Sequence, residues 1–494
     1  MYPDGFVPFI NGVIDDRYGT IGWRMPVGGF QMDLSQTYGF NRLHYNINKT
    51  LNASIAALDP NGISPSQFDA GGFSFAQYTT NLDFSRYFPG VMGQGMNVAF
   101  GGEYRKEKYK IFAGERGSYI DADGVGVGGN AGSQGFPGFQ PADETDSSRN
   151  SAAAYLDIEA DITSRLKLQG AVRFEDYSDF GSTTTGKLAG LFKLDENFAF
   201  RGSLSTGFRA PSLQQAHFSS TFTDFISGVP LDVVLAPNGG AIARAAGIPD
   251  LKEEKSKSYT FGATWNPTPA IAVTADFYEI RIDDRIVLSG RFDADNYPAL
   301  GNILQSLGVG QAQFFVNSVD TRTKGVDLTF SWKAQTGLGR LNTYVGYNYS
   351  KTDVTGIHAP TALAGFEDVL LSERERLFIE QGAPRQKAVV GFNLASGKLE
   401  TDFKIIYFGE QTLGTFSGTE NGVPNAHYAS KTSADIALTW AFSPNTKLTV
   451  GAANIFDKHP TEQDPNETDN GFKYDSVQFG LNGRSYFARL WTRF

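Results

Sequence analysis

The segment "SAAAYLDIEADITSRLKLQGAVRFEDY" (residues 151–177) contains the pattern on which the fold depends. Its first half has an apolar residue at every second position: Ala152, Ala154, Leu156, Ile158, Ala160 and Ile162. The positions between them are mostly polar: Tyr155, Asp157, Glu159 and Asp161. After the short turn "TSR" the second half alternates in the same way, with Leu166, Leu168, Val172 and Phe174 opposed to Lys167, Gln169, Arg173 and Glu175. A period of two residues predicts two strands, each with one apolar and one polar face.

The same alternation recurs along the whole chain. We predict 17 strands, near residues 10–24, 29–48, 73–88, 95–114, 150–163, 166–179, 184–195, 198–208, 255–267, 270–283, 314–335, 339–353, 385–395, 398–409, 430–442, 446–456 and 483–494. They are longer than the usual strand of about five or six residues. Tryptophans recur near strand ends, as a membrane interface requires: Trp265, Trp332, Trp440 and Trp491. A soluble β-sandwich also alternates, but its strands are shorter and its alternation is less sustained.

Short and long connections alternate between these strands. The short turns are "PVGG", "TSR", "DEN", "NPTP", "QTGLGR", "SGK" and "SPNT". The long connections are 49–72, 115–149, 209–254, 284–313, 354–384, 410–429 and 457–482, with 180–183 as a short member of the long set. Tight turns at one rim and long loops at the other are typical of a transmembrane barrel, whose closure pairs every backbone group in lipid. We therefore predict an all-β chain that folds as a transmembrane antiparallel β-barrel.

Composition excludes several classes of protein. The chain has 494 residues, a mean hydropathy of -0.27 and no run near the roughly 18 apolar residues of a spanning helix. It has no cysteine, which excludes disulfides, thiolate metal sites and cysteine nucleophiles. The net charge of -10 argues against a nucleic-acid partner. The first residues, "MYPDGFVPFINGV", lack the basic and apolar regions of a signal peptide.

Several segments, taken together and in order, resemble the barrel of TonB-dependent outer-membrane receptors. They are "DLSQTYGFNRLHYNINKTLNAS" (33–54), "SRNSAAAYLDIEADI" (148–162), "RGSLSTGFRAPSLQQ" (201–215), "SVDTRTKGVDLTFSW" (318–332), "PRQKAVVGFNL" (384–394), "GAANIFDKHP" (451–460) and the terminal Phe494. The resemblance covers residues 1–494 and implies a barrel of 22 strands with a plugged lumen. With about 17 strands here, we expect the first five strands, the plug and the signal peptide to lie outside this chain. The alternative is a complete small barrel, but bacterial single-chain barrels have even strand numbers.

The resemblance implies energised uptake of a scarce nutrient, most often a ferric siderophore, across the outer membrane of a Gram-negative bacterium. The expected partners are that ligand, outer-membrane lipid, the barrel-assembly machinery and, through the plug, the TonB complex. No nucleic-acid partner, cofactor or metal site is expected. An anionic, aromatic ligand would suit guanidinium donors and aromatic rings, and the candidate residues are Arg173, Arg201, Arg209, Arg489, Phe136 and Phe139. The assembly machinery is expected to read Phe494 and Trp491 in the last strand.

Three other functions stay open. A barrel without a plug could act as a passive diffusion pore or as a surface-binding protein, and an enzyme in the barrel wall is a third possibility. No nucleophile constellation stands out, so we predict no enzyme. The Gly-rich segment 121–135 lacks the later ligands of a calcium loop and predicts a flexible extracellular loop. Segments 241–247 and 298–308 predict short loop helices, and 372–382 predicts a solvated face or short helix.

Overall fold

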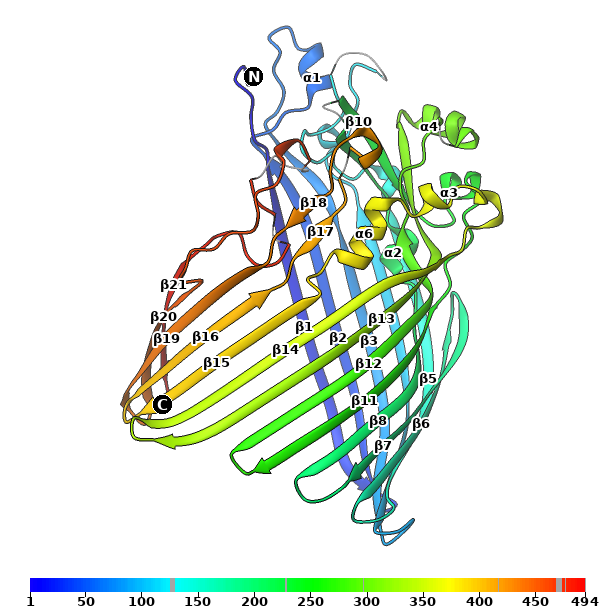
Figure 1. Cartoon of the computed structure of the whole chain (residues 1–494). Helices are drawn as coiled ribbons and strands as arrows, with labels where there is room; N and C mark the ends of the chain where they lie inside the picture. The colour runs from blue at the N-terminus through cyan, green and yellow to red at the C-terminus, as the bar shows by residue number, and fades with distance from the viewer. Residues whose placement is uncertain are drawn as a thin grey trace.

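The structure is a computed structural model that describes residues 1–124, 129–226, 229–295, 297–415, 417–467, 473–475 and 477–493. Its wall is one large sheet in which each strand pairs with the next in an antiparallel ladder (Figure 1). The strands of the wall are β1 (Phe9–Val27), β2 (Phe30–Asn48), β3 (Gln67–Pro89), β4 (Gly95–Phe112), β5 (Thr145–Asp161), β6 (Leu166–Tyr177), β7 (Gly181–Lys193), β8 (Phe198–Arg209), β11 (Glu254–Thr268), β12 (Ile271–Leu288), β13 (Gln311–Thr336), β14 (Gly339–Ile357), β15 (Gln386–Ser396), β16 (Leu399–Phe408), β19 (Lys431–Ser443), β20 (Thr446–Ala453) and β21 (Ser485–Thr492).

The predicted strand count is confirmed for the described residues. The sheet has 19 strands, and two of these, β9 (Ser220–Ile226) and β10 (Val229–Ala236), join it only through β13, which leaves 17 in the wall. The pairing of β10 with β13 is parallel, from Val233 opposite Gln311 to Ala236 opposite Phe314. Neither β9 nor β10 was predicted, and this parallel contact departs from the expected all-antiparallel pattern.

Short turns and long connections lie at opposite ends of the wall, as the sequence predicts. Figure 1 shows the turns at the lower end and all labelled helices toward the upper end. The helices are α1 (Ala53–Leu58), α2 (Leu213–His217), α3 (Ala241–Ala245), α4 (Gly301–Leu307), α5 (Glu367–Leu370) and α6 (Glu373–Gln381). Helices α3, α4 and α6 confirm the loop helices predicted at 241–247, 298–308 and 372–382. Within the described ranges, none of the helices has the length and apolar character needed to span a membrane.

Three of the long connections, 209–254, 284–313 and 354–384, pack together above the wall and form a cap. Its hydrophobic core combines residues of β10, α3, the upper ends of β12 and β13, α4 and α5. The fully buried members include Ala243, Phe292, Leu300, Phe314, Val316, Leu363 and Leu370. Because these residues come from three different connections, each connection is ordered by contacts with the other two.

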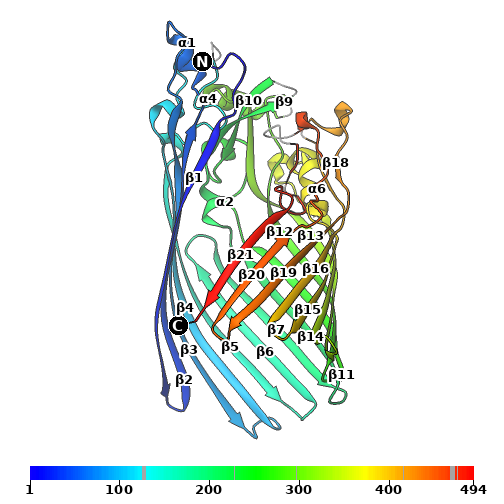
Figure 2. The same cartoon turned by 90° about the vertical axis from the view of Figure 1, so that its left-hand side faces the viewer.

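The first and last strands of the wall lie on the side that faces the viewer in Figure 2. In the described part of the chain, β1 pairs with β2 and β21 pairs with β20, and no ladder joins β1 to β21. Each of these two strands therefore presents one free edge.

Candidate ligand-binding surface

The inner face of the wall is identified by a loop segment that packs against it. Helix α2 lies within the outline of the wall in Figures 1 and 2. Its Leu213 packs in one cluster with Tyr109 of β4, and Pro211 just before it accepts a hydrogen bond from Arg149 of β5. Odd-numbered residues of β4, β5 and β6 therefore face the lumen. The even-numbered apolar set, such as Leu156 and Phe174, faces outward and is exposed.

Arg149 is the buried polar anchor of this inner surface. Its Nε lies 2.7 Å from Oε2 of Glu107 in β4, and its Nη1 donates to the carbonyl of Pro211 at 2.6 Å. The guanidinium also lies over the ring of Tyr177, 5.4 Å from its centroid. The Arg149 side chain is only 6% exposed. It thus ties the α2 segment to β4 and β5.

The predicted arginines are held by acidic neighbours. Arg173 pairs with Glu175 at 2.6 Å and with Glu103 at 3.7 Å. Arg201 donates hydrogen bonds from both Nε and Nη2 to the carboxylate of Asp276 in β12, and the distance from Nε to Oδ1 is 2.8 Å. These contacts orient each guanidinium toward the inner surface and neutralise it. An anionic ligand would therefore compete with a carboxylate already in place.

Arg209 and Arg489 lie at different levels of the wall. Arg209 ends β8 and forms a two-pronged pair with Glu254, whose Oε1 also accepts from the backbone of Ile286 at 2.7 Å. Arg489 in β21 faces the lumen opposite Thr449, and no ion pair to it is found among the described residues. Trp491, on the same face, is 48% exposed. Phe494 lies outside the described residues.

Phe136 and Phe139 come together in an aromatic cluster on the inner face of β2, β3 and β4. Their ring centroids are 5.8 Å apart, and Tyr45 and Phe73 pack against them. Phe139 is only 1% exposed, so its ring supports the loop from within. Within the described ranges, no contact joins this pair to the four predicted arginines.

Helix α2 carries a residue that the sequence analysis did not select. His217 lies near Asp179 and Arg149, and burial lowers the pKa of its imidazole. The helix begins with a capping box, in which Ser212 and Gln215 exchange hydrogen bonds. That S-x-x-Q pattern is readable in "RAPSLQQ" and could have predicted the helix. The sequence offers no local signal that the helix lies inside the wall.

The Gly-rich segment 121–135 is described only in part, because residues 125–128 lie outside the described ranges. Burial, reinforced by a hydrogen bond with Asp123, raises the pKa of Asp121. Asp123 accepts a hydrogen bond from the backbone of Gly129 at 3.0 Å. The described residues contain no group of three or more side chains suited to hold a metal ion.

Comparison with known proteins agrees with this architecture. The family model "TonB dependent receptor-like, beta-barrel" matches residues 8–455. No curated protein sequence matches the chain. Among solved structures, the siderophore receptor PirA from Acinetobacter baumannii is similar, with 15% identity and a TM-score of 0.65 over 98% of this chain and 63% of that one. A mutant of the ferric enterobactin receptor PfeA from Pseudomonas aeruginosa has 14% identity and a TM-score of 0.65, over 98% and 62%.

A third similar structure is the ferric citrate transporter FecA, with 12% identity and a TM-score of 0.60 over 97% of this chain and 62% of that one. At such identities the likeness shows the fold alone. The chain spans less than two thirds of the length of these three structures. The family match, by contrast, extends over most of the sequence and over nearly all strands of the wall. The chain therefore belongs to the TonB-dependent receptor-like β-barrel family.

Proposed function

We propose that this chain forms the barrel wall of a receptor in the outer membrane of a Gram-negative bacterium, which takes up a ferric siderophore with energy supplied through TonB. The observation that carries the proposal is the family match over residues 8–455. The names of similar structures, a siderophore receptor and a ferric enterobactin receptor among them, support the ligand class. We propose no enzymatic activity.

The free edges of β1 and β21 support a larger barrel. Unpaired backbone groups in lipid each cost several kcal/mol, so an open sheet edge is not tolerated in the hydrocarbon region. We therefore propose that further strands, up to the expected 22, and a plug complete the barrel. The plug would make the contact with TonB, and the assembly machinery would read Trp491 and Phe494.

For ligand binding we propose the lumen cations and the aromatic cluster already described. Arg489 is the clearest candidate, because it faces the lumen and has no ion pair in the described part of the chain. Arg173, Arg201 and Arg209 would contribute by exchanging a carboxylate neighbour for the ligand. Phe136 would present its ring at the edge of the cluster, while Phe139 supports it from below.

The test is uptake of radioactive iron by cells that carry or lack this receptor, with a panel of ferric siderophores. We expect accumulation that stops when the proton gradient is collapsed. Accumulation that follows the external concentration and ignores the gradient would instead mean a passive pore. Absence of the protein from the outer-membrane fraction would contradict the proposed location. Arg489→Gln should weaken binding of the accepted ligand, with Lys447→Gln on the neighbouring strand as a control.

A further inference from the structure

The ladder between β7 and β8 stops before either strand ends. β7 stays paired with β6, and β8 stays paired with β11, up to the upper ends of both strands. The pairing of β7 with β8 reaches only to Lys187 opposite Ser205. In Figure 1 the tip of the β6–β7 hairpin stands at the right, apart from the strands that follow it. The wall therefore has a gap here, and we call the space between residues 181–186 and 206–209 the slot.

One side chain closes the lower end of the slot. The hydroxyl oxygen of Thr206 accepts from the backbone N–H of Gly186 at 2.9 Å and lies 3.5 Å from the carbonyl oxygen of the same residue. The backbone groups of Gly186 therefore point toward β8, and in an antiparallel strand those of Thr184 and Ser182 point the same way. Among the described residues, no strand pairs with these two on that side. The upper part of β7 thus presents a free strand edge to the slot.

Two hollows in the surface meet at the lower end of the slot. The first, of about 510 Å³, lies on the outward face, where Leu188 and Leu204 line it. The second, of about 450 Å³, is lined by residues of both faces, the outward Val172 and the lumen-facing Thr185 among them. The residues common to both hollows are Ala171, Gly186, Lys187, Ser205 and Thr206. The hollows thus coincide with the end of the ladder.

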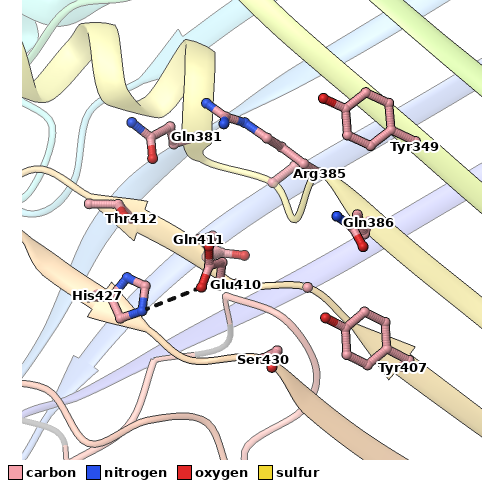
Figure 3. Close-up of a pocket in the computed structure, with 12 residues that line it drawn as sticks. Tyr349, Gln381, Arg385, Gln386, Tyr407, Glu410, Gln411, Thr412, His427 and Ser430 are labelled. Atoms are coloured by element: carbon pink, nitrogen blue, oxygen red, sulfur yellow. Dashed lines mark ion pairs between the residues drawn. The ribbon is translucent and has the colours of Figure 1, made fainter.

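A hollow by itself does not open the wall, as the cavity in Figure 3 shows. This cavity of about 370 Å³ lies over the upper ends of β14, β15 and β16, and the hydroxyl groups of Tyr349 and Tyr407 point toward it. The strands beneath it remain paired, with Tyr349 opposite Gln386 and Lys387 opposite Phe408. It is therefore a hollow of the outer surface, whereas the slot coincides with a break in the ladder.

The slot begins at the depth of the membrane. β7 ends at Lys193, beside a short turn, and Gly186 and Thr184 lie seven and nine positions before that end. At about 3.4 Å per residue and a tilt of about 40°, these two positions are about 18 and 23 Å above the turn. The apolar band of an outer-membrane barrel is about 25 Å tall. Backbone groups without partners are costly at that depth, so the slot requires an occupant that forms hydrogen bonds.

A cation lies on the lumen side of the slot. Lys187 faces the lumen between Ala171 of β6 and Ser205 of β8, and neither neighbour is charged. Among the described residues, no carboxylate forms an ion pair with its ammonium group. On the outward side, Leu188 is 66% exposed and Leu204 is 55% exposed. The slot therefore joins a positive lumen side, a polar strand edge and an apolar outer side.

We propose that the slot binds an amphiphile with an amide-linked acyl chain. Its carboxylate lies beside Lys187, its amide group pairs with the backbone of Thr184, and its alkyl chain lies over Leu188 and Leu204 in the membrane. An amide supplies one donor and one acceptor, as a neighbouring strand would. For the receptor proposed above, this names the class of chelate, one that carries such an acyl chain. The inference rests on that proposed function.

The test uses N-lauroylglycine with a photoreactive diazirine in its alkyl chain. The complete receptor is purified from outer membranes, placed in phosphatidylcholine nanodiscs and illuminated, and the labelled residues are located by mass spectrometry. We expect the label to concentrate at residues 186–188 and 204–206. Unlabelled N-lauroylglycine should compete, and N-acetylglycine, which lacks the long chain, should not. N-lauroylsarcosine should compete about tenfold less well, because its methylated amide has no hydrogen to donate.

Gly186→Leu should close the slot. A Cβ at Gly186 would meet only the carbonyl oxygen of Ala171, at 3.5 Å, so the leucine side chain has room to take the place of the alkyl chain. Labelling should fall about tenfold or more, because the two groups cannot fill the same space. Gly190→Leu is the matched control on the outward face of β7. There the ladder is complete, and the nearest atom to an added Cβ is the side-chain end of Leu168 at 3.3 Å.

Lys187→Gln should weaken competition by N-lauroylglycine about tenfold, because a charge-assisted hydrogen bond to the carboxylate is lost. Lys193→Gln is its control: Lys193 faces the lumen from the same strand, below the slot, and its replacement should leave competition unchanged. This pair of variants decides the question if Gly186→Leu does not assemble.

Label spread evenly over the outward faces of the wall would overturn the inference, because it would mean that the probe only partitions into lipid. Equal competition by N-lauroylglycine and N-lauroylsarcosine would also overturn it, since the free edge of β7 would then play no part. The iron-uptake experiment is read separately. Energised uptake with no label at the slot overturns only this inference, and label at the slot without iron uptake overturns only the proposed transport.

Discussion

The ring of Tyr344 in β14 lies directly over Gly391 in β15, so that a Cβ added at Gly391 would come within 2.1 Å of the ring. Both residues face the lumen, opposite each other in the ladder. The glycine leaves the space that the aromatic ring fills, which is the cross-strand arrangement known as aromatic rescue of glycine. The same relationship joins Phe487 to Gly451 and Tyr278 to Gly325.

Gly391→Ala should destabilise the wall by about 1–3 kcal/mol, because the methyl group overpacks against the Tyr344 ring. The free energy of unfolding in urea, followed by tryptophan fluorescence, measures this cost. Adding Tyr344→Ala should recover part of the loss in a double-mutant cycle. Gly19→Ala is the control, since a Cβ at Gly19 would have no atom within 4 Å. If Gly391→Ala lowers the free energy of unfolding by the same amount in the Tyr344→Ala background, the contact with the Tyr344 ring is not the cause of the loss.

Arg149→Met should cost about 3–5 kcal/mol, because it leaves the carboxylate of Glu107 buried without its cation. The α2 segment also loses the hydrogen bond to Pro211, so protease cleavage between residues 210 and 219 should accelerate. The double variant with Glu107→Gln should be less damaged than the single one. Arg201→Met is the comparison, because its pair with Asp276 is more exposed and is expected to contribute at most about 1 kcal/mol.

Packing of α2 should depend on pH through His217. Burial, more than its charged neighbours Asp179 and Arg149, lowers the pKa of this imidazole in the folded chain. Because the folded chain holds the pKa of His217 below its unfolded value of about 6.5, folding is favoured by the neutral imidazole. This contribution to stability is present above about pH 6.5 and is lost as pH falls through the pKa of the folded chain. Hydrogen exchange of the amides of residues 213–218 should therefore gain protection at pH 7.5 relative to pH 5. His217→Gln should remove this difference in protection. If the variant keeps the same pH dependence, a titrating group other than His217 must be its cause.

Asn52 should tolerate neither alanine nor aspartate. Its Oδ1 caps α1 by accepting from the backbone of Ser54 and Ile55, and its Nδ2 donates to the carbonyls of Gly117 and Ile120. Aspartate is a good N-cap but has no donor, so Asn52→Asp places a carboxylate against two carbonyl oxygens. We expect a loss of about 2–3 kcal/mol for either variant, measured as lost amide protection at residues 116–122.

The exposed Asn61→Asp provides the control for that experiment, because its side chain lies at the surface of the same connection. If Asn52→Asp behaved like the unaltered chain, capping of α1 would be its whole contribution. The two donated hydrogen bonds to the neighbouring connection would then be dispensable.

The sequence predicts the wall well because its signals are local. Period-two alternation and turn residues place most strand ends within a few positions, as for β6, predicted at 166–179 and found at Leu166–Tyr177. The prediction fails where strands extend above the membrane. There both faces meet protein or water, so alternation fades: β3 begins at Gln67 instead of 73, and β5 at Thr145 instead of 150.

The candidate site was less accessible from sequence. Alternation predicts correctly that Arg173 and Arg201 face the lumen, but it does not identify their partners. Asp276 lies 75 residues from Arg201, and only the register of β8, β11 and β12 brings them together. The cap is similar: Phe292 lies in a loop and Phe314 near the start of β13, and nothing in their spacing shows that they pack with each other.

The shared core of the cap has a consequence for the order in which the chain folds. β10 needs the upper end of β13 as its template, although β11 and β12 lie between them in the sequence, and the core also needs Leu363 and Leu370 from a later connection. Contacts of such long sequence separation form slowly, because the closure entropy of the intervening chain precedes any gain. The hairpins of the wall, joined by short turns, have no such delay. The cap is therefore the late-forming part of the molecule, and its loops acquire their final shape only after the strands beneath them are in register.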